Sequence, residues 1–119
     1  MLTIKTKLKE FPEKGIGLTA DQDIKEGQVI WKYSPLIDIT IKKTEIPPEA
    51  KGFFDTYGVD RGSDTLFLNT DNARFINHSK DPNIKSIGHL KNNIAIRNIK
   101  KGEEITIDYN EIDVTDIDF

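Results

Sequence analysis

The sequence contains no cysteine, and its 119 residues include only two histidines, one tryptophan and one methionine. The absence of cysteine excludes disulfide bonds and cysteine-based zinc sites, and it is compatible with a reducing compartment. Two histidines alone do not make a structural zinc site, so we expect no metal. No apolar run approaches the roughly 18 residues that span a membrane, and the N-terminus lacks the apolar stretch of a signal peptide. We therefore expect an intracellular protein that contacts no membrane.

Basic residues are missing from the C-terminal end of the chain. Residues 103–119 contain seven acidic residues and no lysine or arginine, whereas the rest of the chain has 17 basic and 13 acidic residues. An acidic end on a mildly basic body argues against a general nucleic-acid binder. It suits a basic protein or peptide as partner. The alternative is a solvated acidic tail without a partner.

Helical patterns are scarce, and short runs that are β-branched or alternate in polarity are common. Residues 46–57 predict a short helix with Phe53, Phe54 and Tyr57 on one apolar face. Pro35 implies a bulge or an edge in the long strand predicted around it. Strands are predicted at residues 2–8, 18–20, 28–40, 65–68, 84–90, 92–99 and 104–109, the last with the clearest alternation. Many short strands with turns between them favour a mostly-β domain.

Three features could carry chemistry. Residues 14–17 hold two glycines separated by one residue, which can expose backbone amides to a ligand or form an ordinary turn. His78, which precedes a predicted turn at residues 81–83, could be a base, a ligand contact or a buried structural residue. Tyr109 ends the strand predicted at 104–109. It could line a pocket, or it could be an ordinary strand-end aromatic residue whose hydroxyl is exposed to water. A nucleophilic pair of Ser79 with His78 is disfavoured, because adjacent side chains rarely meet in that geometry.

Four segments, in this order, resemble the motifs of the SET domain, the fold of many protein lysine methyltransferases. Their sequences are Lys14-Gly15-Ile16-Gly17-Leu18, residues 25–33, residues 71–83 with the signature Arg-Phe-x-Asn-His-Ser at 74–79, and residues 102–110, which end in Asp108-Tyr109-Asn110. The similarity runs from about residue 3 to residue 110, and the ordered combination is specific. The chain looks like the small viral and bacterial members of the family.

The resemblance implies a mostly-β SET fold (β-clip) with several short sheets in a single domain of residues 1–119. It implies a pseudoknot in which residues 74–79 meet the strand at 104–109. A variable, partly helical insert would lie at about residues 42–64, and a short acidic tail at residues 110–119.

The resemblance also implies methyl transfer from S-adenosylmethionine to the ε-amine of a lysine in a protein substrate, with S-adenosylhomocysteine as product and no metal. Tyr109 would be catalytic, and Tyr33, Tyr109 and Phe119 would contact the substrate. Many members complete this channel with a cysteine-rich zinc module, so here Phe119 or the tail before it would have to substitute. The implied cofactor-binding residues are Lys14, Gly15, Ile16, Gly17, Tyr57, Arg74, Phe75, Asn77 and His78.

The expected partner is a basic protein or peptide, such as a histone-like or other lysine-rich segment, without direct nucleic-acid contact, and a homodimer is an open option. We expect a cytoplasmic protein if the source is bacterial and a protein of the host nucleus if it is viral. Two alternatives remain open. One is a non-catalytic module that binds the cofactor or a peptide, and the other is a plain β-domain that mediates protein interactions.

Overall fold

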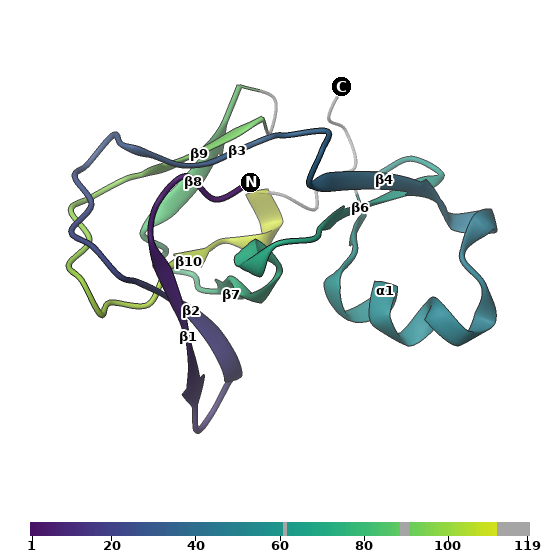
Figure 1. Ribbon diagram of the computed structural model, residues 1–119, viewed down its shortest axis with the longest axis horizontal. Coiled ribbons are helices and arrows are strands. Elements are labelled where there is room, and N and C mark those ends of the chain that lie inside the picture. The colour runs from purple at the N-terminus through teal and green to yellow at the C-terminus, as the bar shows by residue number, and fades with distance from the viewer. Residues whose placement is uncertain (61, 89–90, 112–119) are drawn as a thin grey trace.

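The computed structural model describes residues 1–60, 62–88 and 91–111, and it is built mainly of short strands (Figure 1). The described strands form four small sheets, two with two strands and two with three. The predicted mostly-β fold is therefore confirmed.

An N-terminal hairpin projects from the rest of the molecule (Figure 1). Its strands, β1 (Thr6–Phe11) and β2 (Gly15–Ala20), are antiparallel, with Phe11 opposite Gly15. Gly15 has φ of 81°, a left-handed conformation that glycine adopts without strain. The residues of the Gly-x-Gly motif are thus placed at the tip of the hairpin and at the start of its second strand.

A second sheet has the order β3-β9-β8. It joins β3 (Val29–Lys32), β9 (Asn92–Ala95) and β8 (Ile84–Ile87), all in antiparallel pairs. The pairing of β3 with β9 shifts register between Val29 and Trp31. This sheet supplies one wall of the core.

The third sheet, in the order β4-β6-β5, carries the insert. It contains β4 (Asp38–Lys42), β6 (Thr65–Asn69) and β5 (Val59–Asp60). Between β4 and β5 the chain forms two 3₁₀ turns, η1 (Lys43–Glu45) and η2 (Pro48–Ala50), and the helix α1 (Lys51–Tyr57). The predicted short helix is confirmed, but these helical segments bury no residue. The aromatic rings of α1 pack against one another instead, and the ring centres of Phe53 and Tyr57 are 5.0 Å apart.

The smallest sheet joins segments that are far apart in sequence. Strand β7 (Asn77–His78) follows the 3₁₀ turn η3 (Asn72–Phe75) and runs parallel to β10 (Thr106–Ile107), which leads into η4 (Tyr109–Glu111). The expected association of residues 74–79 with the C-terminal strand is confirmed.

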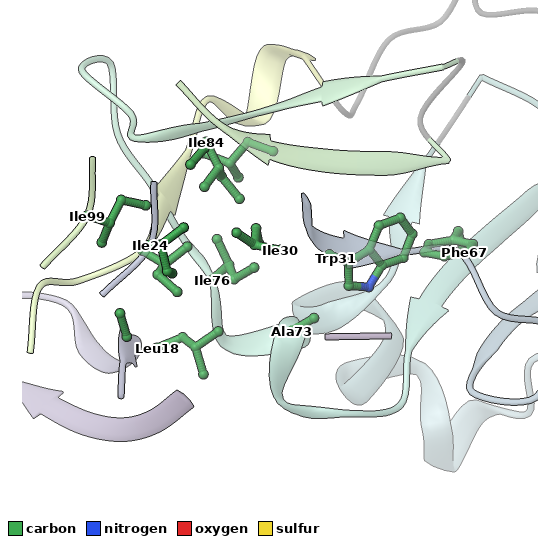
Figure 2. Packing of buried hydrophobic residues seen from close by; sticks show 13 residues of the cluster. Leu18, Ile24, Ile30, Trp31, Phe67, Ala73, Ile76, Ile84 and Ile99 are labelled. Carbon is green, nitrogen blue, oxygen red and sulfur yellow. The ribbon is translucent and has the colours of Figure 1, made fainter. Parts of the chain in front are cut away.

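The hydrophobic core gathers side chains from all four sheets, and isoleucine is its commonest residue (Figure 2). β-branched side chains fit the pleated surfaces of several small sheets well. The cluster consists of Leu18, Ala20, Ile24, Ile30, Trp31, Phe67, Ala73, Ile76, Ile84, Ala95, Ile99, Ile105 and Ile107. No helix in the described part of the chain is long and apolar enough to cross a membrane.

Two strand predictions were wrong. The long strand at 28–40 is broken into β3 and β4, which belong to different sheets, by a turn in which the Ile37 and Asp38 amides donate to the Ser34 carbonyl. The strand at 104–109 is reduced to β10, and Ile105, Thr106 and Ile107 are all buried. Alternation predicts one wet face, but both faces of this segment are buried, since Ile105 and Ile107 belong to the core and Thr106 between them is only 8% exposed.

Candidate active site

Tyr109 is held by two hydrogen bonds to the segment that ends in β7. Its backbone N–H donates to Nδ1 of His78 over 3.0 Å, and its hydroxyl donates to the carbonyl of Ile76 over 2.7 Å. The parallel pairing of β7 with β10 brings these residues together. Because both the main chain and the phenol are anchored, the ring has a defined position at the end of the knot.

The His78 side chain is used to hold Tyr109. Nδ1 accepts from the Tyr109 amide, so the ring proton of the neutral imidazole belongs on Nε2. The same Nδ1 lies 3.7 Å from a carboxylate oxygen of Asp108, and the two rings of His78 and Tyr109 are 5.2 Å apart. The geometry therefore assigns His78 a positioning role at its side chain.

A cavity of about 290 Å³ lies beside Tyr109. Its walls come from the C-terminal end of α1, from β6, from η3 and from the sheet that contains β3 and β9. Tyr57, Arg74 and Tyr109, three of the predicted site residues, line it together. Its size is close to the lower end of the range found for small-molecule pockets.

Three residues that line this cavity carry a buried polar atom without a hydrogen-bond partner in the described structure. These atoms are Nε1 of Trp31, Oδ1 of Asn69 and Nε of Arg74. Such groups are rare in native proteins, and each costs about 1–3 kcal/mol. Three of them around one cavity fit a site that receives a ligand with polar groups.

Arg74 is otherwise well anchored. One of its terminal nitrogens donates to the carbonyls of Thr70 and Asp71, each at 3.1 Å. Its guanidinium lies 4.5 Å from the centre of the Phe75 ring and 5.8 Å from that of Tyr57. Arg74 thus ties α1 to η3 by cation–π contacts and forms one fixed wall of the cavity.

A second polar cluster joins the hairpin to the knot. The Asn77 side-chain amide donates to the Ile16 carbonyl at 3.3 Å and to Oε2 of Glu104 at 2.9 Å. Oε1 of Glu104 accepts from Nζ of Lys14 at 2.8 Å. A Cβ on Gly17 would lie 2.6 Å from Glu104 Oε2, so a larger residue there would have to displace the side chains of this cluster. The space beside Gly15 is open within 4 Å.

Other predicted residues lie at the edge of this arrangement or beyond it. Tyr33 follows β3, is 39% exposed and does not line the cavity, although its ring centre is 6.2 Å from that of Phe67, which does. Phe75 packs edge-on against Tyr57 at 5.6 Å. Phe119, like all of residues 112–119, lies outside the described residues.

Three further residues of the site were not predicted from the sequence, namely Trp31, Asn69 and Glu104. Trp31 lies in the second motif, residues 25–33, and Glu104 lies in the fourth, residues 102–110, but the motifs alone indicate no role for either side chain. Asn69 ends β6, two residues before the third motif begins. Within the described ranges no three His, Asp or Glu side chains gather as metal ligands, so no metal site is assigned there.

Comparison with known proteins identifies relatives over most of the chain. A family profile described as the SET domain matches residues 15–110. A histone-lysine N-methyltransferase of Candida albicans, described as specific for lysine 36 of histone H3, is 35% identical over 117 residues, which are 89% of this chain and 14% of the relative. An enzyme of the same description from Debaryomyces hansenii is 37% identical over 108 residues, 82% of this chain and 15% of that protein. The chain therefore spans about one seventh of the length of these curated relatives.

Solved structures show the same fold. DIM-5, a SET-domain histone lysine methyltransferase of Neurospora, has a TM-score of 0.62 at 22% identity, and the match covers 91% of this chain and 53% of that one. A humanized mutant of the Chaetomium thermophilum polycomb repressive complex 2 has a TM-score of 0.67 at 22% identity, with 92% of this chain and 15% of that one covered.

Proposed function

The chain belongs to the SET-domain family, and from this membership we propose that it transfers methyl groups from S-adenosylmethionine to the ε-amine of a lysine in a protein substrate. One observation carries the proposal. Tyr109 stands at the wall of a cavity of about 290 Å³, anchored by its amide to His78 and by its hydroxyl to Ile76. A phenol fixed in this way can orient an amine that enters the cavity.

The residues present fit the proposed cofactor. The unpartnered polar atoms of Trp31, Asn69 and Arg74 around the cavity suit a ligand with polar groups, and the open space beside Gly15 admits a ligand to the hairpin. Lys14 to Gly17, Tyr57, Arg74, Phe75, Asn77 and His78 would hold S-adenosylmethionine, as expected from the sequence. When bound, the cofactor supplies an electrophilic methyl on a sulfonium.

The chain's own residues would prepare the amine. A free lysine has a pKa of about 10.4, whereas the nucleophile must be neutral. The cavity wall includes Trp31, Phe67, Ile76 and Ile107, and desolvation by such side chains lowers the pKa of an amine. Because Tyr109 donates its proton to the Ile76 carbonyl, its oxygen acts as an acceptor for an amine N–H. Much of the rate would come from this positioning.

A basic, histone-like segment is the proposed substrate class. The named relatives are described as specific for lysine 36 of histone H3, and their similarity covers 89% and 82% of this chain. The acidic residues between 103 and 119 would attract such a segment. Phe119 would complete the substrate channel in place of the zinc module of other members.

The test is incubation of the purified chain with methyl-labelled S-adenosylmethionine and recombinant histones, followed by mass spectrometry of the labelled peptide. We expect label on a lysine within a basic segment. Calorimetric titration with S-adenosylhomocysteine runs in parallel. If S-adenosylhomocysteine binds but neither histones nor the proteins of a lysate become labelled, the chain is a non-catalytic cofactor-binding module. If S-adenosylhomocysteine does not bind, the proposed function is rejected.

A further inference from the structure

Strand β4 (Asp38–Lys42) has one edge that pairs with no strand in the described part of the chain. It is the terminal strand of the sheet β4-β6-β5 and pairs with β6 only. Figure 1 shows it near the outer margin of the molecule. An open edge of this kind offers backbone N–H and C=O groups to a further strand.

The hydrogen bonds of β4 to its neighbour show which backbone groups point outward. The Lys43 amide donates to the carbonyl of Asp64, at the end of the ladder between β4 and β6. Bonded and unbonded pairs alternate in an antiparallel ladder, so the residues at positions 39 and 41 also direct their backbone groups to β6. The N–H and C=O groups of Thr40 and Lys42 consequently point to the open edge, as does the carbonyl of Asp38.

The sequence of β4 is self-complementary when two copies run antiparallel. Ile39-Thr40-Ile41 reads the same in both directions, and it is flanked by an acid, Asp38, and a base, Lys42. When Thr40 lies opposite Thr40 of a second copy, Ile39 lies opposite Ile41, and Asp38 lies opposite Lys42. Cross-strand pairs of β-branched residues and of opposite charges stabilise a sheet. A register centred on Lys42 would instead place two lysines opposite each other.

The apolar side chains around this edge are incompletely covered. Ile39 is 40% exposed, and Leu36, in the turn that leads into β4, is 90% exposed, the highest value among the large apolar side chains of the described ranges. Ile41 lies opposite Leu66, so the two side chains share a face of the sheet, and Leu66 lines a groove together with Phe54 of α1. A second copy at the edge would cover Ile39 and extend this apolar surface.

Strand β1 shows how an open edge is protected in the same molecule. It pairs with β2 only, and it carries Lys7 and Lys9 at exposed positions. Lysines along an edge strand discourage pairing with another chain. In β4 the charged residues stand at opposite ends and have opposite signs, so they favour antiparallel pairing with a copy of the same strand.

We propose that two copies of this chain associate through β4, about a two-fold axis at Thr40, to form one sheet with the order β5-β6-β4-β4-β6-β5. The two Thr40 residues exchange backbone hydrogen bonds across the axis. Each Lys42 amide donates to the Asp38 carbonyl of the other copy, whereas the Asp38 amide already donates to the Ser34 carbonyl. The same surface serves both copies, as in other two-fold interfaces. The inference does not depend on the proposed function.

The first test is sedimentation equilibrium of the purified chain over about a hundredfold range of concentration. We expect twice the 13.5 kDa mass of one chain at the upper end and dissociation on dilution. Thr40→Lys places like charges opposite each other at the axis and should raise the Kd of the dimer about tenfold or more. The matched control is Thr40→Val, which keeps the β-branched shape without a charge, so its Kd should stay within about threefold. Both variants should unfold cooperatively in urea, since Thr40 is exposed.

The second test determines the register and uses the absence of cysteine from the chain. In an antiparallel sheet the Cα atoms of opposite residues are about 4.5 or 5.5 Å apart, which is within reach of a disulfide. Thr40→Cys should therefore form a covalent dimer in oxidised glutathione, and a mixture of Ile39→Cys with Ile41→Cys should form the mixed dimer in preference to either homodimer. Lys9→Cys, at an exposed position of β1, is the control and should remain mainly monomeric. Mass spectrometry of the intact chains measures the products.

A wild type that stays monomeric at every concentration would overturn the inference. If the Thr40 and Lys42 amides of that monomer are protected from hydrogen exchange, another segment of the chain covers β4, and if they exchange freely the edge is open to water. A dimer that Thr40→Lys leaves intact, or equal cross-linking of Thr40→Cys and Lys9→Cys, would place the contact elsewhere. These measurements involve no cofactor, so their failure is distinguishable from failure of the proposed function.

Discussion

At the scale of the residue, the backbone amide of Tyr109 and its hydroxyl are anchored by different partners. The His78 ring accepts the Tyr109 amide, and the Tyr109 hydroxyl meets the Ile76 carbonyl. A ring that is anchored through its own backbone does not depend on the hydroxyl for its place. Removal of the hydroxyl should consequently affect turnover far more than structure.

Tyr109→Phe should lower kcat by about 10²-fold or more, since positioned groups at a reacting centre contribute about 10²–10⁴-fold. The Kd of S-adenosylhomocysteine should stay within about threefold, and the free energy of unfolding should fall by only about 1 kcal/mol for the lost hydrogen bond. Steady-state methylation, calorimetry and urea unfolding measure the three effects. Full activity in this variant would reject the assigned role.

At the scale of the element, the two-residue pairing of β7 with β10 is too short to hold the knot alone. The buried Asn83 reinforces it from the side. Its amide nitrogen donates to the Glu104 carbonyl at 2.7 Å, and its oxygen accepts from the Thr106 amide at 2.9 Å. Asn83 is 1% exposed, and its bond to the Thr106 amide is buried, so little water can replace the side chain there.

Asn83→Ala should therefore lower the free energy of unfolding by roughly 2–4 kcal/mol, because one buried and one partly buried backbone group lose their partners. Urea unfolding followed by circular dichroism measures this. Asn98→Ala is the control, since Asn98 is exposed and makes one hydrogen bond to the Glu26 amide; its cost should be about 1 kcal/mol or less. Equal losses in both variants would contradict the anchoring role of Asn83.

The insert is held by contacts of a different kind. Asp60 in β5 accepts from Nζ of Lys43 at 2.9 Å and from the Gly62 amide at 3.0 Å. The hydrogen bond from the Lys43 side chain, followed by that from the Gly62 backbone, lowers the pKa of Asp60 below its ordinary value. A lowered pKa in the folded state means that this contribution to stability is present above the unfolded pKa and is lost as the pH falls through the folded pKa.

Lys43→Met should accordingly raise the pKa of Asp60 toward the usual value of about 3.9 for aspartate. An NMR titration of the Asp60 carboxyl carbon checks this directly. Lys51→Met is the control, because Lys51 pairs with Asp55 and leaves the Lys43 contact intact. An unchanged Asp60 titration in Lys43→Met would show that the Gly62 amide alone sets the pKa.

At the scale of the whole molecule, charge is divided between a mildly basic body and an acidic end. Replacement of Glu111, Asp113 and Asp116 by neutral residues should raise the apparent KM for a basic peptide, and the difference should shrink at high salt, since exposed charges are screened over about 10 Å at 0.1 M. Methylation kinetics at two ionic strengths measure it. A KM that does not change would remove the steering role.

Much of this molecule could be predicted from the sequence, because the motifs carry local signals. The helix at α1 and the strand β6 follow from residues that are close in sequence, and Tyr109 and Asn77 stand in recognisable patterns. The pairing of β3 with β9 and of β4 with β6, in different sheets, and the burial of residues 105–107 depend on neighbours from distant parts of the chain. Glu104 escaped notice for the same reason, since its partners are Lys14 and Asn77.

The parallel pairing of β7 with β10 also has a consequence for synthesis. Asn77 and His78 leave the ribosome well before Thr106 and Ile107, the residues with which they pair. Contacts between segments far apart in sequence form late and slow the folding of a domain. The nascent chain consequently lacks the partners of Asn77 and His78 until translation has passed Ile107, so the knot around Tyr109 forms at the end of folding rather than during it.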